Sequence, residues 1–177
     1  MNHEIIISGF GGQGALFAGQ LIAYGALAEN RHVTWIPSYG PEMRGGTAHC
    51  TVIISDQEIG SPLVRRPSAA IVMNPPSFER YEPAMQPGGV LIANASLIAT
   101  PSQRADIRAL AIKANEIATE ICSPQLANMV LTGALVTATG MLKLETLDQV
   151  LYERISARHR DKLELNKRCL RRGAALV

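Results

Sequence analysis

The chain has 177 residues, a mass of 19.0 kDa and a formal net charge of +2, which favours one domain and gives no electrostatic reason to expect a nucleic-acid binder. Apolar residues make up 47% and charged residues 18%, so a sizeable core is expected and wholesale disorder is excluded. Cys50, Cys122 and Cys169 are scattered, so no four-thiolate zinc or iron–sulfur site, and no metal site of another kind, is predicted.

The first predicted elements are a strand, a glycine-rich turn, a helix and a second strand. Residues 4–8 are a β-branched run, residues 9–14 contain four glycines, and residues 15–29 place small and apolar residues at helical spacing. A second strand is predicted at 32–36, where Pro37 ends it. This succession is typical of a βαβ unit, so the two strands are predicted to be parallel.

Strands and helices also alternate along the rest of the chain. Strands are predicted at 47–55, 69–73, 90–93 and 107–112, and helices at 77–81, 116–121, 125–142, 147–156 and 160–174. The pattern predicts a single domain over residues 1–177. Its fold class is α/β, a Rossmann-like three-layer domain with a mostly parallel sheet and a helical C-terminal part.

Two segments bear on location and contacts. Residues 121–142 carry no charge, but proline, glycine and polar residues interrupt them, so a buried or interface helix is expected and no membrane span. Small residues there, Gly133 among them, would also permit a homodimer contact. Residues 152–173 hold eight basic and three acidic residues, typical of a solvated face or a contact with an acidic partner. The N-terminus resembles no export signal and the cysteines suggest no disulfide framework, so a cytoplasmic location is expected.

The glycine turn has the spacing of a dinucleotide-binding motif, GxGxxG, between a strand and a helix. Such a turn lets a phosphate approach the backbone N–H groups at the helix start. The acidic residue expected at the end of the second strand is absent, because Ile36, Pro37 and Ser38 stand there. Three interpretations stay open: a nicotinamide or flavin site, a site for a phosphate or another anion, or tight packing. The candidate site residues are Gly9, Gly11, Gly12 and Gly14.

Other common catalytic patterns are missing from the sequence. It contains no GxSxG or HExxH motif, and no GDG segment with downstream asparagines, the usual magnesium–thiamine diphosphate signature. His49 and Cys50 are adjacent in a predicted strand and therefore point to opposite faces. No catalytic residue is predicted.

A second loop, at 38–47, combines large polar side chains with glycines. It follows a strand end, where open α/β sheets bind ligands or partners. A phenol, a carboxylate and a guanidinium stand within six residues of one another, so the loop is predicted to contact a partner or an active site, with a plain solvated loop as the alternative. The residues concerned are Tyr39, Glu42, Arg44, Gly45 and Gly46.

Taken together, the two motifs resemble a known family. The segments GFGGQG at 9–14, YGPEMRGG at 39–46, CTVIISD at 50–56 and IGSP at 59–62 are similar to the gamma subunit of 2-oxoacid:ferredoxin oxidoreductases. The resemblance is strong from Ile5 to about Gly89 and weaker in the helical tail. Among the branches, the separate gamma chains of the 2-oxoglutarate type are the most similar, and branched-chain 2-oxoacid enzymes are close relatives.

The resemblance implies a subunit that is inactive alone. Complexes of this family convert a 2-oxoacid and coenzyme A into acyl-CoA and CO2 and reduce ferredoxin. Thiamine diphosphate, Mg²⁺ and the iron–sulfur clusters would lie on partner subunits, alpha and beta and in some members a ferredoxin-like delta chain, so this chain would meet ferredoxin only indirectly. The alternatives that the residues leave open are a stand-alone nucleotide-binding oxidoreductase using the GxGxxG turn, and an interaction module without a ligand.

Overall fold

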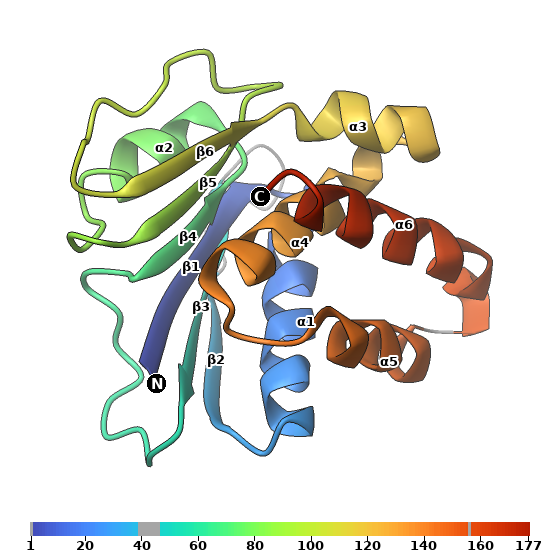
Figure 1. The fold of residues 1–177 in the computed structure, drawn as a ribbon, viewed down its shortest axis with the longest axis horizontal. Helices are drawn as coiled ribbons and strands as arrows, with labels where there is room; N and C mark the ends of the chain where they lie inside the picture. The colour runs from blue at the N-terminus through green and yellow to red at the C-terminus, as the bar shows by residue number, and fades with distance from the viewer. Residues whose placement is uncertain (1, 39–46, 156) are drawn as a thin grey trace.

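The computed structural model describes residues 2–38, 47–155 and 157–177 of the chain. A six-stranded sheet has the strand order β2–β3–β1–β4–β5–β6 (Figure 1). The strands are β1 (Asn2–Phe10), β2 (His32–Ser38), β3 (Thr47–Ser55), β4 (Ala69–Val72), β5 (Val90–Asn94) and β6 (Arg108–Ile112). The helices are α1 (Ala15–Ala28), α2 (Pro75–Tyr81), α3 (Ala114–Ile121), α4 (Ala127–Thr139), α5 (Leu144–Arg154) and α6 (Leu163–Ala174), with short 3₁₀ turns η1 (Pro124–Leu126) and η2 (Ala157–Lys162).

The sheet is mostly parallel, as predicted. Strands β1, β4, β5 and β6 pair in parallel, while β3 is antiparallel to both of its neighbours, β1 and β2. Strands β1 and β2 therefore point the same way, which confirms the predicted direction. They are not adjacent, however, because β3 lies between them and takes the hydrogen bonds that a simple βαβ unit would form between its own two strands.

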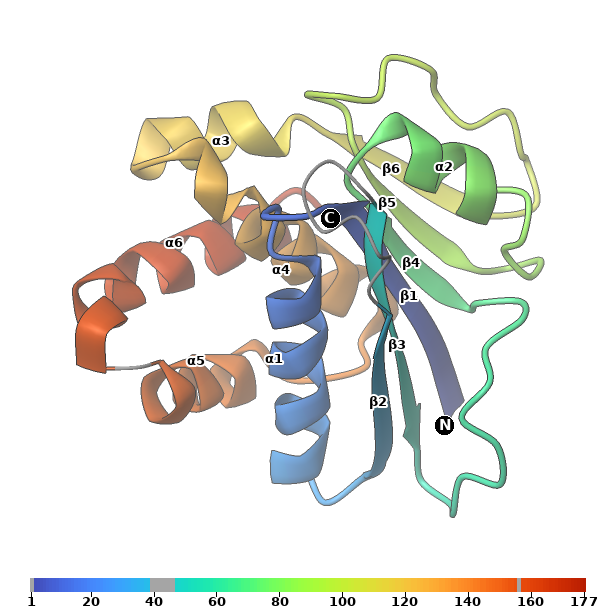
Figure 2. The ribbon, with the colours of Figure 1, turned by 180° about the vertical axis from the view of Figure 1, so that it is seen from behind.

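Alternate residues of β1, β4 and β5 belong to two different cores. In β1, Ile5 and Ile7 belong to a large core under the helices, whereas Ile6 belongs to a smaller one together with Tyr81 and Met85. Helices α1, α4, α5 and α6 lie on one side of the sheet and α2 lies on the other (Figures 1 and 2). The predicted three-layer α/β architecture is therefore confirmed.

Two glycines set the distance between α4 and α6. A Cβ added at Gly133 would stand 1.9 Å from the backbone oxygen of Leu170, and a Cβ added at Gly173 would stand 1.8 Å from that of Val130. The two backbones thus touch where glycine alone fits. Gly133 contacts a helix of its own chain, so it is not free for the homodimer contact that the sequence suggested. Within the described residues, no helix is long and apolar enough to cross a membrane.

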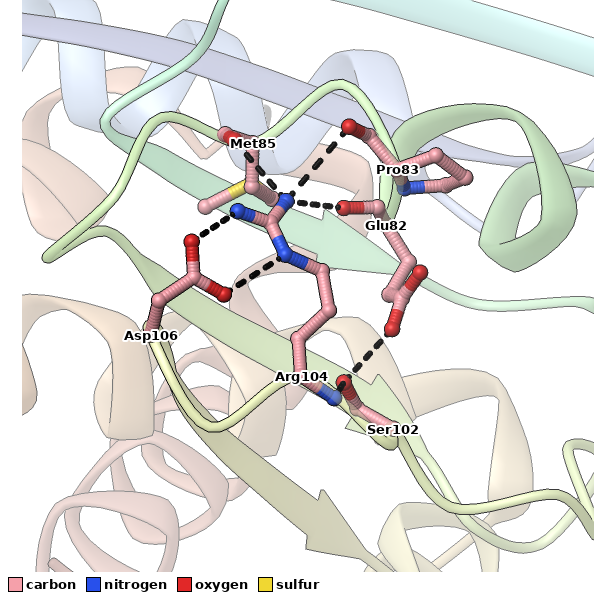
Figure 3. Close-up of polar contacts among 6 residues, drawn as sticks. All are labelled: Glu82, Pro83, Met85, Ser102, Arg104 and Asp106. Carbon is pink, nitrogen blue, oxygen red and sulfur yellow. Dashed lines mark hydrogen bonds and ion pairs between the residues drawn. The ribbon is translucent and has the colours of Figure 1, made fainter.

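Arg104 fastens the segment between β5 and β6 to the end of α2 (Figure 3). Its guanidinium donates to the backbone oxygens of Glu82 and Met85 at 2.9 Å each and to Oδ1 of Asp106 at 2.9 Å. The Ser102 hydroxyl donates to the Glu82 carboxylate at 2.6 Å. The hydrogen bond from Arg104 holds the pKa of Asp106 below its usual value. These bonds hold the segment between β5 and β6 against the end of α2 on this side of the sheet.

Candidate functional site

The glycine turn joins the carboxyl end of β1 to the start of α1. Gly12 and Gly14 have φ angles of +93° and +78°, a conformation that other residues rarely adopt. A Cβ added at Gly9 would stand 2.9 Å from Cβ of Met73, so β1 and the residue after β4 approach closely. At Gly12, an added Cβ would meet no described atom within 4 Å. The turn is therefore held tightly at its base and is open to space at its tip.

Gln13 holds this turn in shape, a role that the sequence analysis missed. Its Oε1 accepts a hydrogen bond from the backbone N–H of Phe10 at 2.6 Å, and its backbone N–H donates to the Phe10 oxygen at 3.1 Å. Its Nε2 also lies 3.5 Å from the backbone oxygen of Met73. A glutamine in a glycine motif gives no sequence signal for this role, because the Met73 contact joins residues 60 positions apart.

Asn128, in the first helical turn of α4, contacts the end of the glycine turn at Gly14. Its Nδ2 donates to the backbone oxygen of Gly14 at 3.2 Å, and a Cβ added at Gly14 would stand 2.4 Å from that nitrogen. The side chain is buried, and its Oδ1 has no hydrogen-bond partner among the described residues. Gly14 is thus required both by its φ angle and by the space that Asn128 occupies.

A cavity of about 220 Å³ opens beside the turn, at the carboxyl ends of β1, β4 and β5. Parallel α/β sheets bind ligands at this edge. The polar side chains that line it are carboxamides, and Asn94 donates to Asn115 across it at 2.9 Å. The lining residues are Gly12, Gln13, Met73, Asn94, Asn115, Pro124, Gln125, Ala127 and Leu131. Such a cavity can form hydrogen bonds with a neutral polar group, and it contributes no charged side chain for acid–base chemistry.

The strand register places the residues that flank the second motif on strands near the glycine turn. Thr47, directly after the second motif, pairs with Phe10, where the glycine turn begins. Ser38, directly before that motif, pairs with His49. The motif residues themselves, Tyr39, Glu42, Arg44, Gly45 and Gly46, lie outside the described residues. Of the two residues that flank them, Thr47 lies beside Phe10, and Ser38 lies one strand further out.

On the α2 side of the sheet, His49, Tyr81 and two serines lie near this edge, with the Arg80 guanidinium 5.2 Å from the centre of the Tyr81 ring. The rings of His49 and Tyr81 lie 6.0 Å apart, and the hydroxyls of Ser8 and Ser77 share a hydrogen bond of 2.8 Å. Burial and, to a lesser extent, the Arg80 guanidinium lower the pKa of His49, and burial raises the pKa of Tyr81. Both side chains are therefore uncharged near pH 7.

The thiols lie apart from this cluster. Cys50 packs on the helix side, where a Cβ added at Gly19 would stand 2.3 Å from its sulfur, and burial raises its pKa to about 12. Because His49 contacts Tyr81 on the other face, the expectation that His49 and Cys50 point to opposite faces is confirmed. Burial also raises the pKa of Cys169 to about 11, and Cys122 is exposed. No group of three His, Cys, Asp or Glu side chains suited to a metal occurs in the described ranges.

Comparison with known proteins identifies the family. Residues 4–176 match the family described as pyruvate ferredoxin/flavodoxin oxidoreductase. The chain belongs to that family. It is 33% identical over 158 residues to the 2-oxoglutarate synthase subunit KorC of Methanocaldococcus jannaschii, covering 88% of this chain and 84% of that one. It is 35% identical over 174 residues to the ketoisovalerate oxidoreductase subunit VorA of Methanothermobacter marburgensis, covering 97% of this chain. Our chain spans only 36% of the length of VorA.

Solved structures of family members share the fold. The gamma subunit of a keto/oxoacid ferredoxin oxidoreductase from Geobacter sulfurreducens superposes with a TM-score of 0.86 at 26% identity, covering 99% of this chain and 95% of that one. The 2-oxoglutarate:ferredoxin oxidoreductase of Magnetococcus marinus, solved with 2-oxoglutarate, coenzyme A and succinyl-CoA, has a TM-score of 0.89 at 22% identity, over 99% of this chain and 31% of that one. The resemblance to gamma subunits indicated by the two motifs is thus confirmed, and the Magnetococcus likeness bears on the fold alone.

Proposed function

We propose that this chain is the gamma subunit of a cytoplasmic, thiamine diphosphate-dependent 2-oxoacid:ferredoxin oxidoreductase. The observation that carries the proposal is the pairing of Phe10 with Thr47, which brings the ends of both family motifs to one edge of the sheet. A chain of this family whose glycine turn lies beside the strand that follows the second motif can present this part of the sheet to another subunit. The fold and the whole-length family match support the same assignment.

The chain takes part in catalysis through its partners. In the proposed complex, the alpha and beta subunits, with a ferredoxin-like delta subunit where present, hold thiamine diphosphate, Mg²⁺ and the iron–sulfur clusters. Thiamine diphosphate supplies the chemistry of 2-oxoacid decarboxylation there, with coenzyme A as the acyl acceptor and ferredoxin as the electron acceptor. No residue of this chain is assigned as catalytic. The carboxamide side chains of the cavity can form hydrogen bonds with a neutral polar group, and His49 and Tyr81 are uncharged near pH 7, so none of them is assigned to acid–base chemistry.

The glycine turn is proposed to contact a phosphate group of coenzyme A. The open space at Gly12 admits a ligand, and the uncapped start of α1 directs backbone N–H groups and a helix dipole toward it. Gln13 and Asn115 in the adjoining cavity can bond to amide or hydroxyl groups of the same ligand.

The proposed substrate is 2-oxoglutarate. KorC subunits of 2-oxoglutarate synthases are separate chains that this sequence covers over 84% of their length, whereas VorA is much longer. The identity to KorC of M. jannaschii, 33%, also exceeds the 28% to the common gamma subunit of the Thermococcus kodakarensis pyruvate/ketoisovalerate enzymes. Ketoisovalerate is the second candidate, since VorA shares 35% identity.

Reconstitution from purified subunits tests the assignment. The chain alone is expected to show no 2-oxoacid oxidation, and the alpha and beta subunits are expected to need it for full coenzyme A-dependent reduction of ferredoxin. Parallel assays with 2-oxoglutarate and ketoisovalerate identify the substrate. Oxidation by the isolated chain, or tight binding of NAD or FAD to it in a calorimetric titration, would support the stand-alone enzyme and refute the subunit assignment.

The glycine turn is tested in the reconstituted complex. Gly12→Ala places a methyl group in the open space of the turn, so the KM for coenzyme A is expected to rise about tenfold while the KM for the 2-oxoacid stays unchanged. Gly60→Ala is the matched control, because Gly60 also faces open space but has no positive φ angle. An unchanged KM for coenzyme A in Gly12→Ala would refute the phosphate contact.

A further inference from the structure

A hollow of about 260 Å³ lies between α1 and α5, which are side by side on the helix side of the sheet (Figures 1 and 2). The buried side chains that line it are aliphatic, Leu21, Val150 and Leu151. Two aromatic rings, Phe17 and Tyr24, line it as well, and Phe17 is 37% exposed. This recess is therefore apolar and opens to the surface, and we name it the α1–α5 hollow.

Two polar side chains line the α1–α5 hollow without a partner. Gln20 of α1 is half-buried, and its carboxamide forms no hydrogen bond within the part of the chain that the structure describes. Arg154, the last residue of α5, forms no ion pair with any described carboxylate. By contrast, Arg171 and Arg172 of α6 are paired with carboxylates of their own chain. The guanidinium and the carboxamide in the hollow are therefore available to a ligand.

Tyr24 holds the Arg154 guanidinium in position. The central carbon of the guanidinium lies 3.8 Å from the centroid of the Tyr24 ring, which is a close cation–π contact. A guanidinium over the face of a ring keeps its N–H groups free at its edge, where they can donate two parallel hydrogen bonds to a carboxylate. Because the side chain is already ordered, binding an anion costs less conformational entropy.

The side chains of the hollow limit the class of ligand. Among the described residues that line it, Arg154 is the one with a charge, so it balances the single negative charge of a carboxylate and not those of a pyrophosphate. The aliphatic and aromatic side chains favour an apolar body beside that charge. An engineered cavity of about 150 Å³ holds benzene, so the larger α1–α5 hollow has room for one ring with a short acidic arm.

We infer that the α1–α5 hollow is a binding site for a small monocarboxylate with an apolar or aromatic body. The carboxylate would pair with the edge of the Arg154 guanidinium, and the body would lie against Phe17 and the aliphatic side chains. The Gln20 carboxamide can form a hydrogen bond with an oxygen of the ligand. The hollow shares no lining residue with the cavity beside the glycine turn. The inference therefore goes beyond the proposed function and does not depend on it.

A first test compares three compounds on the full-length chain. Phenylacetate combines a ring with a carboxylate, 2-phenylethanol keeps the ring without the charge, and acetate keeps the charge without the ring. Binding is measured by NMR titration, in which the amide signals of α1 and α5 are followed. Phenylacetate is expected to bind with a dissociation constant of about 1 mM or below, and the other two compounds at least about tenfold more weakly.

A second test removes the cation or the exposed ring. Arg154→Gln is expected to weaken the binding of phenylacetate at least about tenfold and to leave that of 2-phenylethanol within about twofold. Arg168→Gln is the matched control, because Arg168 is also exposed and lies on α6, outside the hollow, so its affinity should stay within about twofold of the unchanged chain. Phe17→Ala should weaken phenylacetate binding at least about threefold. Circular dichroism and thermal unfolding check that each variant is folded.

Each outcome supports or overturns the site. The inference is overturned if phenylacetate shows no saturable binding up to about 10 mM, or if 2-phenylethanol binds equally well. It is also overturned if Arg154→Gln and Arg168→Gln bind phenylacetate alike, or if the shifted signals lie outside α1 and α5. If Arg154→Gln does not fold, the comparison of the three compounds and Phe17→Ala supply the answer. None of these results changes the proposed function, which the reconstitution assay tests separately.

Discussion

The two faces of the sheet bury their residues in different ways. On the helix side, Ile5 and Ile7 are fully buried, and the helices above them pack so closely that α4 and α6 meet through glycines. On the α2 side, Ile6 is buried but Ile36, two strands away on the same face, is 41% exposed. One face is completed by the chain itself, whereas on the other the edge strand β2 keeps a partly exposed isoleucine.

Because of this difference, substitutions on the two faces of the sheet are expected to have different effects. A well-packed layer tolerates little change in volume, because neighbouring backbones cannot move apart without losing contacts. A partly exposed side chain such as Ile36 contributes less burial to the stability of the chain. Substitutions of buried residues on the helix side should therefore destabilise the chain more than substitutions of Ile36.

The largest effect is expected for Gly133→Ala. The new Cβ would stand 1.9 Å from the backbone oxygen of Leu170, so α4 and α6 must separate. We expect a loss of about 3 kcal/mol or more in the free energy of unfolding, measured by urea denaturation. Gly60→Ala, which meets no atom within 4 Å, is the control and should be neutral. A Gly133→Ala variant as stable as the control would contradict the close helix contact.

The second largest loss of stability is expected for variants of the glycine turn, at the carboxyl end of β1. Gly14→Ala combines a strained φ angle with a collision against Asn128, whereas Gly12→Ala carries the strain alone. Strain of this kind costs about 1–2 kcal/mol, so Gly12→Ala should lose about that much and Gly14→Ala clearly more. Thermal and urea unfolding of the two variants give the comparison. Equal losses in the free energy of unfolding would show that the Asn128 side chain moves aside without destabilising the protein.

Much of the fold could be predicted because its signals are local. β-branched runs, the glycine turn and the helical spacing of small residues locate most elements, including the strand at 47–55, whose bounds the structure reproduces. The position of β3 between β1 and β2 could not be predicted. Strand order depends on contacts between distant residues, and a βαβ pattern is compatible with a third strand inserted between its two strands.

Some residues of the candidate site could likewise be predicted from the sequence, and others could not. The glycines of the turn could be singled out, and for Gly9, Gly12 and Gly14 the structure shows a positive φ angle or a close approach that requires glycine. Their role as a phosphate site stays a prediction. Asn128 and Asn115 could not be found from one sequence: the contact of Asn128 with Gly14 spans 114 positions, and a lone asparagine in a helical segment carries no signal.

The third prediction uses the pH dependence of His49, which lies against Tyr81 on the α2 side of the sheet. Its pKa lies below the ordinary value of 6.5, first because of burial and then because of Arg80. As the pH falls below about 6.5, the unfolded chain binds this proton before the folded chain does, so stability declines through that window. His49→Gln should reduce the decline in the free energy of unfolding between about pH 7.5 and 5.5. Some decline should remain, because His3 also has a lowered pKa. An identical decline in the variant would exclude His49 as a source.

The smallest effect is expected from one substitution made on both faces. Ile7→Val removes a methylene from the fully buried helix side and should lose about 1 kcal/mol in the free energy of unfolding. Ile36→Val removes the same group from a side chain that is 41% exposed and should change stability by less than about 0.5 kcal/mol. Because the chemistry is identical, urea denaturation of the two variants compares burial alone. Equal losses would mean that Ile36 is already covered in the isolated chain, by a second copy or by residues of its own chain.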